Sequence, residues 1–133
     1  MNQRIFIKIP VAGDTSYIAF PEKQWKKEGL SLLYPIIDTS CVECFHPHRL
    51  IMSSRFSIWC DENGYMNQKV PNFLASRLHG QQRILGVALL ELGTFDLDTT
   101  EGRIKFMAKL DKVPRWLCGV ELRPPLHTLL VAA

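Results

Sequence analysis

The chain has 133 residues, of which 47% are apolar and 22% are charged. This length allows one hydrophobic core but not two, and the composition excludes a disordered or low-complexity protein. The formal charge of +3 is too small to indicate nucleic-acid binding by itself.

The chain begins with a predicted β-hairpin. Residues 4–9 alternate, with Ile5, Ile7 and Ile9 on one face and Phe6 on the other, which is the period of a half-buried strand. A turn at Ala-Gly-Asp follows, and the β-branched and aromatic residues of 15–20 predict the second strand.

A short helix should follow the hairpin. Pro21 stands at a first helical position and Gly29 closes a run of good helix formers, so we expect one or two helical turns between them. Any continuation should end by Tyr34, because the residue before Pro35 is biased away from helix.

The middle of the chain predicts two strands, 41–45 and 55–60, joined by a loop that contains HPHRLIMS. In SIWCDENGYMN, the pair Asn63-Gly64 is a strong hairpin signal, because both residues tolerate the positive φ of a type I′ turn. We therefore expect the strand after this turn to pair with the strand before it.

The second half predicts a helix from Pro71 to Leu78 that stops at Gly80, and then a buried central strand over 84–92. Asp98-Thr99 caps a further helix. Its predicted core face consists of Ile104, Met107, Ala108 and Leu110.

These elements predict an α+β fold: a small, mainly antiparallel sheet with two or three short helices packed on it. Residues 1–112 should form the single domain. Residues 113–133 should form a C-terminal extension, in which WLCGVEL and LHTLLVA are candidates for an added strand or an oligomerisation arm.

The chain should be cytoplasmic. No apolar span of about 18 residues occurs, and Lys8 and Pro10 interrupt the place where a secretory signal would continue. We therefore expect no membrane partner and no disulfide.

A metal site is the first chemistry to consider. Two cysteines and two histidines lie within eight residues, at Cys41, Cys44, His46 and His48, and these are zinc ligand types. On a strand Cys41 and Cys44 would point to opposite faces, and the ligand pairs lack an intervening loop. Packed thiols are the favoured interpretation, and no metal or other cofactor is predicted.

Catalysis has little support. The chain has no Gly-x-Ser-x-Gly, phosphate loop or His-Glu-x-x-His motif. Asp61 and Glu62 are the alternative, as an acid–base pair, but residues beside Asn-Gly are usually structural. A non-enzyme is therefore the favoured class.

A binding site has better material. Arg77, His79 and Arg83 flank the end of the predicted 71–78 helix, and Trp59 and Tyr65 belong to the predicted hairpin. Cationic and aromatic groups together suit a phosphate-bearing, base-bearing ligand. Asn72 completes the predicted ligand-binding set, as a group that bonds to polar edges. The alternative is that the arginines are solvated and that Trp59 is a core residue.

Several motifs together resemble a phage, plasmid and bacterial family known as domain of unknown function 3846. They are WCDENGYMN, VPNFLAS and ILGVALL, within a span of about residues 30–110. The positions similar to the family pattern are Glu43, Asp61, Glu62, Gly64, Pro71, Asn72, Ala75, Ile84 and Gly86. Asp38-Thr39-Ser40 departs from the pattern, because the family usually has a glycine pair there.

The resemblance implies a mobile-element accessory protein without an established activity. By analogy with phage proteins of this size, we expect a non-catalytic protein that binds a small phosphorylated ligand. This ligand would be of the nucleotide type, such as a host immune-signalling nucleotide in the host cytoplasm. The alternative is a protein-interaction module that inhibits a host protein, and a homo-oligomer is a further candidate state.

Overall fold

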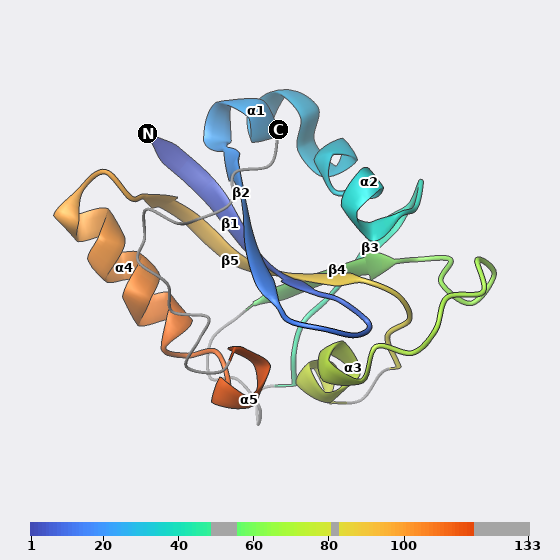
Figure 1. Ribbon diagram of the computed structural model, residues 1–133. Coiled ribbons are helices and arrows are strands. Elements are labelled where there is room, and N and C mark those ends of the chain that lie inside the picture. Colours follow the sequence, from blue (N-terminus) through green and yellow to red (C-terminus); the bar gives the residue numbers. More distant parts are fainter. Residues whose placement is uncertain (49–55, 81–82, 119–133) are drawn as a thin grey trace.

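The computed structural model describes residues 1–48, 56–80 and 83–118. They form one five-stranded antiparallel sheet in the order β2-β1-β5-β4-β3 (Figure 1). The strands are β1 Asn2–Ile9, β2 Ser16–Pro21, β3 Val42–Phe45, β4 Ser57–Asp61 and β5 Ala88–Asp96. The predicted α+β class with an antiparallel sheet is confirmed.

The described residues also form six helical segments, more than the two or three that were predicted. They are α1 Glu22–Glu28, the 3₁₀ helix η1 Gly29–Leu32, α2 Tyr34–Ile37, α3 Phe73–His79, α4 Thr100–Leu110 and α5 Arg115–Cys118. Helix α2 begins where a helix was expected to end. Pro35 lies in its first turn, where a missing N–H leaves no hydrogen bond unmade.

Alternation along β1 builds a core on each face of the sheet. Ile5, Ile7 and Ile9 are buried with residues from α3, α4 and α5, whereas Phe6 is buried on the other face with residues from α1 and α2. The predicted faces of this strand are confirmed. The sheet is therefore the middle of three layers.

The predicted hairpin at Asn63-Gly64 is wrong. β4 pairs with β3 and β5, and residues 62–68 form successive turns rather than a returning strand. The Asp61 carboxylate accepts a hydrogen bond from the Asn63 N–H at 2.9 Å, and Asn67 N–H donates to the Asn63 carbonyl at 2.8 Å. These bonds coil the backbone. The positive φ falls at Gln68, at 56°, instead of at Gly64.

The central strand lies four residues later than predicted. β5 spans Ala88–Asp96 and pairs with both β1 and β4, so the predicted central position is confirmed. Residues 84–87 instead approach α3: Leu85 forms an isolated bridge with Pro71, and Gly86 turns the chain with a φ of 79°.

Helix α4 buries only part of the predicted face: Leu110 is buried and Met107 packs against the core, whereas Ile104 and Ala108 are exposed. Gly102, Phe106 and Leu110 are its buried residues, and Ile104 is 64% exposed. The reason is a close approach to β5. A Cβ added at Gly102 would lie 1.7 Å from the Asp96 carbonyl oxygen, so only glycine lets the helix sit this close.

Replacing Gly102 by alanine should therefore destabilise the fold by about 2 kcal/mol, because the added methyl forces α4 away from β5. In an open helix the same change would stabilise by about 1 kcal/mol. Urea unfolding measures the free energy of unfolding of the wild type and of the variant. Ala108→Gly, on the exposed face of α4, is the control for the effect of helix propensity alone. A Gly102→Ala protein as stable as the wild type would contradict this packing.

The structured unit extends past the boundary predicted at residue 112. Val113 and Leu117 are each 4% exposed and belong to the core, and α5 forms where an extended arm was expected. The rest of WLCGVEL and all of LHTLLVA lie outside the described residues. No helix in the described part has the length and apolar character needed to cross a bilayer.

Candidate ligand-binding site

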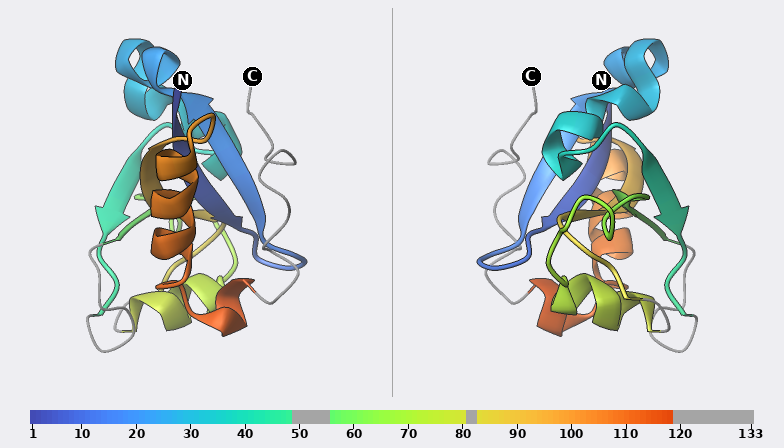
Figure 2. Two further views of the ribbon diagram at one scale, coloured as in Figure 1. Left: turned by 90° about the vertical axis from the view of Figure 1, so that its left-hand side faces the viewer. Right: turned by 90° about the vertical axis from the view of Figure 1, so that its right-hand side faces the viewer.

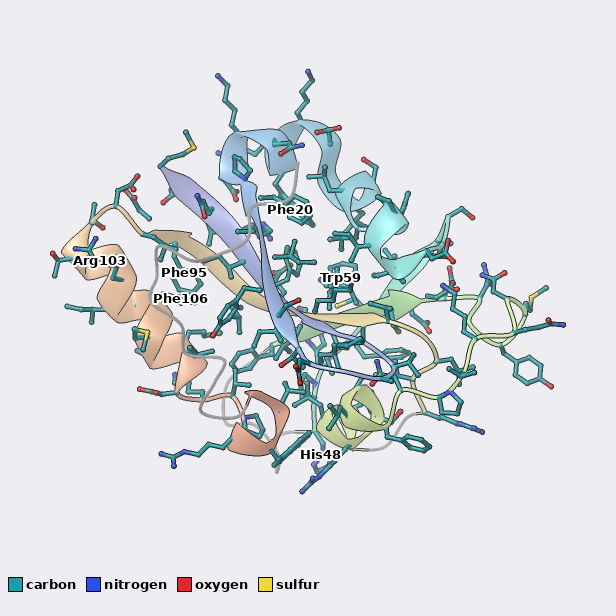
Figure 3. All side chains as sticks on the ribbon, in the orientation of Figure 1. Phe20, His48, Trp59, Phe95, Arg103 and Phe106 are labelled. Carbon is teal, nitrogen blue, oxygen red and sulfur yellow. The ribbon has the colours of Figure 1, made fainter. Side chains whose placement is uncertain are left out.

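The structure does not bring the six predicted ligand residues together. Trp59 projects from β4 toward α1 and α2, and its Nε1 donates to Glu91 Oε1 at 3.3 Å. Figure 3 shows Trp59 on this side of the sheet and His48 near α3 and α5. Tyr65 is 88% exposed on the loop after β4. Neither aromatic residue therefore joins the site expected at the end of α3.

Asn72 is a structural residue, which corrects its predicted role in ligand binding. It is fully buried. Its Oδ1 accepts from the Ala75 N–H at 3.0 Å, which caps α3, and its Nδ2 donates to the carbonyls of Ile9 and Gly86 at 2.8 and 2.9 Å. No side-chain hydrogen of Asn72 is left for a ligand.

Arg77 and His79 do lie at one end of the molecule, with α5. Figure 2 shows α3 and α5 side by side at the end opposite α1. The Arg77 guanidinium carbon lies 4.2 Å from the centre of the Trp116 ring, a cation–π contact between the two helices. His79 meets Phe45 edge to face at 5.1 Å, and its carbonyl accepts from the His48 N–H at 2.9 Å.

The exposed charges at this end are mostly positive. Lys112, which precedes α5, and Arg115, its first residue, are exposed, as is Arg77. Asp111 is exposed beside them and lowers the net charge. We call Arg77, His79, Lys112, Arg115 and Trp116 the α3–α5 site. Its surplus of cations suits an anionic ligand.

Arg83 lies along the flank of α3 rather than at its end. The next residue, Ile84, receives a hydrogen bond at its carbonyl from the Asn72 N–H at 2.8 Å, and its own N–H donates to Ser76 Oγ at 2.8 Å. These bonds fix the chain beside the first turns of α3. Arg83 is exposed there and is peripheral to the α3–α5 site.

His79 supplies hydrogen bonding rather than charge at neutral pH. Burial, together with the neighbouring His48, lowers the pKa of His79. The neutral imidazole is therefore the main form near pH 7, and the positive charge of the site comes from Arg77, Lys112 and Arg115.

Trp116 was missed because the sequence after Pro114 was assigned to an extended arm. The signal that could have found it is the spacing of Val113 and Leu117, which are four residues apart and both buried. This spacing predicts a helical turn packed on the core. Trp116 then lies beside Leu117 on that turn, next to α3.

A second cluster of charged and aromatic residues lies on the α1–α2 face. Arg4 Nη1 lies 3.4 Å from Glu91 Oε2 and Arg4 Nη2 lies 3.5 Å from Glu22 Oε1. The Arg4 guanidinium also lies 4.7 Å from the centre of the Trp25 ring. The two carboxylates neutralise Arg4, so this cluster ties α1 to the sheet and leaves Arg4 little charge for a ligand.

Asp61 and Glu62 do not form an acid–base pair. Burial would raise the pKa of Asp61, but hydrogen bonds from Thr39, Asn67, Lys69 and the Asn63 N–H outweigh it and lower this pKa to about 2. Asp61 is therefore a fixed anion at neutral pH. Glu62 Oε2 instead accepts from the Cys41 thiol at 2.5 Å, which raises the pKa of Cys41 and makes it a poor nucleophile.

Three of the four candidate metal ligands, Cys41, Cys44 and His46, have other partners or orientations. Cys44 is exposed and pairs in register with Trp59 on β4, while Cys41 contacts Glu62. His46 Nδ1 lies 2.9 Å from the Phe56 carbonyl oxygen. Within residues 1–48, 56–80 and 83–118, no three histidine, cysteine, aspartate or glutamate side chains are grouped to hold a metal ion.

Comparisons with known proteins add no relative. No family model matches the chain, and no curated protein or solved structure matches it either. The resemblance to domain of unknown function 3846 therefore stays a prediction. The functional proposals depend on the fold and on the side chains described above.

Proposed function

We propose that this protein is a non-catalytic binding protein for a small phosphorylated ligand, which it holds at the α3–α5 site. The observation that carries the proposal is the stacking of the Arg77 guanidinium on Trp116 at 4.2 Å. Stacking uses the face of the guanidinium and leaves its N–H donors in the plane, where they can bind two phosphate oxygens.

The neighbouring side chains support an anionic ligand of modest size. Lys112 and Arg115 are exposed and add positive charge. His79, with its lowered pKa, adds a neutral hydrogen-bonding group. The free face of a stacked guanidinium is also a surface on which a base can lie. A nucleotide-type ligand combines all of these features.

The finer proposal concerns the biological ligand. If the chain is a phage or mobile-element protein, as the resemblance implies, the ligand would be a host immune-signalling nucleotide that the protein sequesters in the host cytoplasm. Sequestration needs tight binding and no chemistry. This requirement agrees with a site whose charged side chains, Arg77, Lys112 and Arg115, are cations suited to holding an anion.

Isothermal titration calorimetry and native mass spectrometry test the proposal with a panel of cyclic dinucleotides and ADP-ribose derivatives. We expect at least one of these compounds to bind at micromolar protein. Arg77→Gln should then weaken binding by about tenfold or more, because it removes a charge-assisted contact.

Lys27→Gln is the matched control, because it removes one exposed positive charge from α1, at the opposite end of the molecule. It should change the affinity by less than about twofold, the effect of a distant screened charge. Absence of binding across the panel, or equal weakening by the two variants, would count against the α3–α5 site.

A further inference from the structure

The loop after β4 contains a pair of residues that is prone to lose an amide group. Asn63-Gly64 is the sole Asn-Gly or Asp-Gly pair in the sequence, and asparagine is a thermally labile residue. The glycine removes the main obstacle to the reaction, because it has no Cβ to shield its backbone nitrogen. The Asn63 side chain is exposed, so water can reach the group that reacts.

The other asparagines of the chain lack this combination. Asn2 and Asn67 are each followed by glutamine, whose side chain crowds the backbone nitrogen, and Asn72 is followed by phenylalanine. Asn72 is also fully buried, with its amide bonded to two carbonyls. Asn63 is therefore the asparagine on which the chemistry should fall first.

The reaction needs only the atoms of Asn63 and Gly64, a base and water. The Gly64 nitrogen gives its proton to the base and attacks Cγ of Asn63, so a C–N bond forms, the bond from Cγ to Nδ2 breaks, and ammonia leaves. The product is a cyclic imide. Water then opens the ring at one of its two carbonyls, which leaves either aspartate or isoaspartate at position 63. In isoaspartate the chain runs through the former side-chain carbon.

The fold restrains the backbone atoms that must move in this reaction. The Gly64 N–H donates to the Asp61 carbonyl at 3.3 Å, and the Gly64 carbonyl accepts from the Lys69 N–H at 2.9 Å. The Asn63 N–H donates to Asp61 Oδ1 at 2.9 Å. The attacking nitrogen has to leave its hydrogen bond and turn toward Cγ, so the loop must open locally before the ring can close.

The side chains of Asp61 and Lys69 hold this loop closed. Lys69 Nζ lies 2.9 Å from Asp61 Oδ2 and donates to the Ile37 carbonyl at 2.7 Å, which joins the loop to the end of α2. Asn67 Nδ2 donates to the same Asp61 oxygen at 2.8 Å. Loss of either charge should therefore increase the fraction of time for which the loop is open.

We propose that Asn63 is a deamidation site whose rate is set by opening of the loop that Asp61 and Lys69 hold. Figure 1 shows this loop extending from the sheet beyond β4 and leading into α3. When opening and closing are fast, the observed rate is the rate in the open loop multiplied by the open fraction. The proposal shares no residue with the α3–α5 site, so deamidation and phosphate binding can fail separately.

Deamidation in turn prevents the loop from closing as before. A new carboxylate at position 63 follows Glu62 directly and lies two residues from Asp61, and charges of the same sign repel. Isoaspartate also adds a backbone atom between the Asn63 N–H and the carbonyl that accepts from the Asn67 N–H at 2.8 Å. The hydrogen bonds to Asp61 and from Asn67 then no longer fit together, so the modification converts a closed loop into an open one.

Peptide mapping by mass spectrometry, on the folded chain kept at mildly alkaline pH, tests the site. Asn63 should lose its amide before Asn2, Asn67 and Asn72 do, and an isoaspartate-specific methyltransferase should label the product. In the chain unfolded by guanidinium chloride, Asn63 should react about tenfold faster or more, because no closed loop delays ring closure.

Two variants test the control of the rate by the loop. Asp61→Asn and Lys69→Met should each speed the deamidation of Asn63 in the folded chain by about tenfold, and a thermal melt checks that each variant is folded. Lys26→Met is the matched control, because it removes an exposed ammonium from α1, and it should leave the rate within about twofold.

Four results would overturn the proposal. They are amide loss at another asparagine before Asn63, an Asn63 that stays intact in the unfolded chain, equal rates in the folded and unfolded chains, and rates in both loop variants equal to that of the wild type.

Discussion

Replacing Asn72 by alanine should lower the free energy of unfolding by about 3–4 kcal/mol, as measured by urea unfolding at neutral pH. The side chain is fully buried and serves three backbone groups, the Ala75 N–H and the carbonyls of Ile9 and Gly86. Alanine would leave all three without a partner in a region closed to water, and each such group costs about 1–3 kcal/mol.

Asn72→Asp separates capping from the other two bonds. Aspartate is as good an N-cap as asparagine, but its second oxygen would face the Ile9 and Gly86 carbonyls and repel them. If capping were the main role, Asn72→Asp would be nearly neutral. We expect it to be at least as destabilising as alanine near pH 7, because a buried unpaired charge is added.

Thr99→Ala is the control for a helix cap at an exposed position; the Thr99 hydroxyl also donates to the Asp96 carbonyl at 3.0 Å. Thr99 caps α4 through a 3.0 Å bond from the Gly102 N–H to its hydroxyl oxygen, and it is exposed. Its loss should cost about 1 kcal/mol. Equal effects of Thr99→Ala and Asn72→Ala would show that the bonds to Ile9 and Gly86 contribute nothing.

One role of Asn72 could be predicted from the sequence and the other could not. The capping role can be inferred from the sequence, because Asn72 stands just before a run of helix formers and Ala75 follows it by three residues. The bonds to Ile9 and Gly86 are not readable, because they join segments 63 and 14 residues away. A polar residue in a recognisable motif was therefore predicted to contact ligand, whereas the fold uses it internally.

Local patterns with a strong period predicted the framework well. The alternation of Ile5, Ile7 and Ile9, the helix between Pro21 and Gly29 and the stop at Gly80 all depend on nearest neighbours along the chain, and all three are confirmed. The hairpin at Asn63-Gly64 failed because the Asp61 carboxylate accepts from the Asn63 N–H and the Asn63 carbonyl accepts from the Asn67 N–H, and these local bonds coil the chain instead of reversing it.

The candidate site was only partly predictable for the same reason. Arg77 and His79 were found from their place at the end of a helix. Trp116, which stacks on Arg77, comes from α5, 39 residues later by the numbering. The spacing of Val113 and Leu117 could have placed Trp116 on a helical turn, but nothing in a single sequence places that turn beside Arg77. The aromatic partner was therefore sought in Trp59 and Tyr65 instead.

Replacing Asp61 by asparagine should lower the free energy of unfolding by about 2–3 kcal/mol near pH 7. The side chain has no exposed area, and the hydrogen bonds from Thr39, Asn67 and the Asn63 N–H, with the Lys69 ammonium at 2.9 Å, favour its charged form. A pKa lowered from 3.8 to about 2 corresponds to about 2 kcal/mol of stabilisation by the charged form. The variant also leaves the Lys69 charge without its partner.

The effect of Asp61→Asn should depend on pH in a definite direction. The pKa of Asp61 is lower in the folded than in the unfolded chain, so the carboxylate stabilises the fold above pH 3.8, and this contribution is lost as the pH falls toward 2. The stability gap between wild type and variant should therefore be full near pH 7 and narrow through this acid range. Glu62→Gln is the control, because it removes the carboxylate of the next residue, whose side chain is exposed. It should lower the free energy of unfolding by less than about 0.5 kcal/mol both near pH 7 and near pH 2. A gap for Asp61→Asn that stays constant from pH 7 to 2 would mean that packing, rather than the charge of Asp61, holds the loop that presents Tyr65 and Met66.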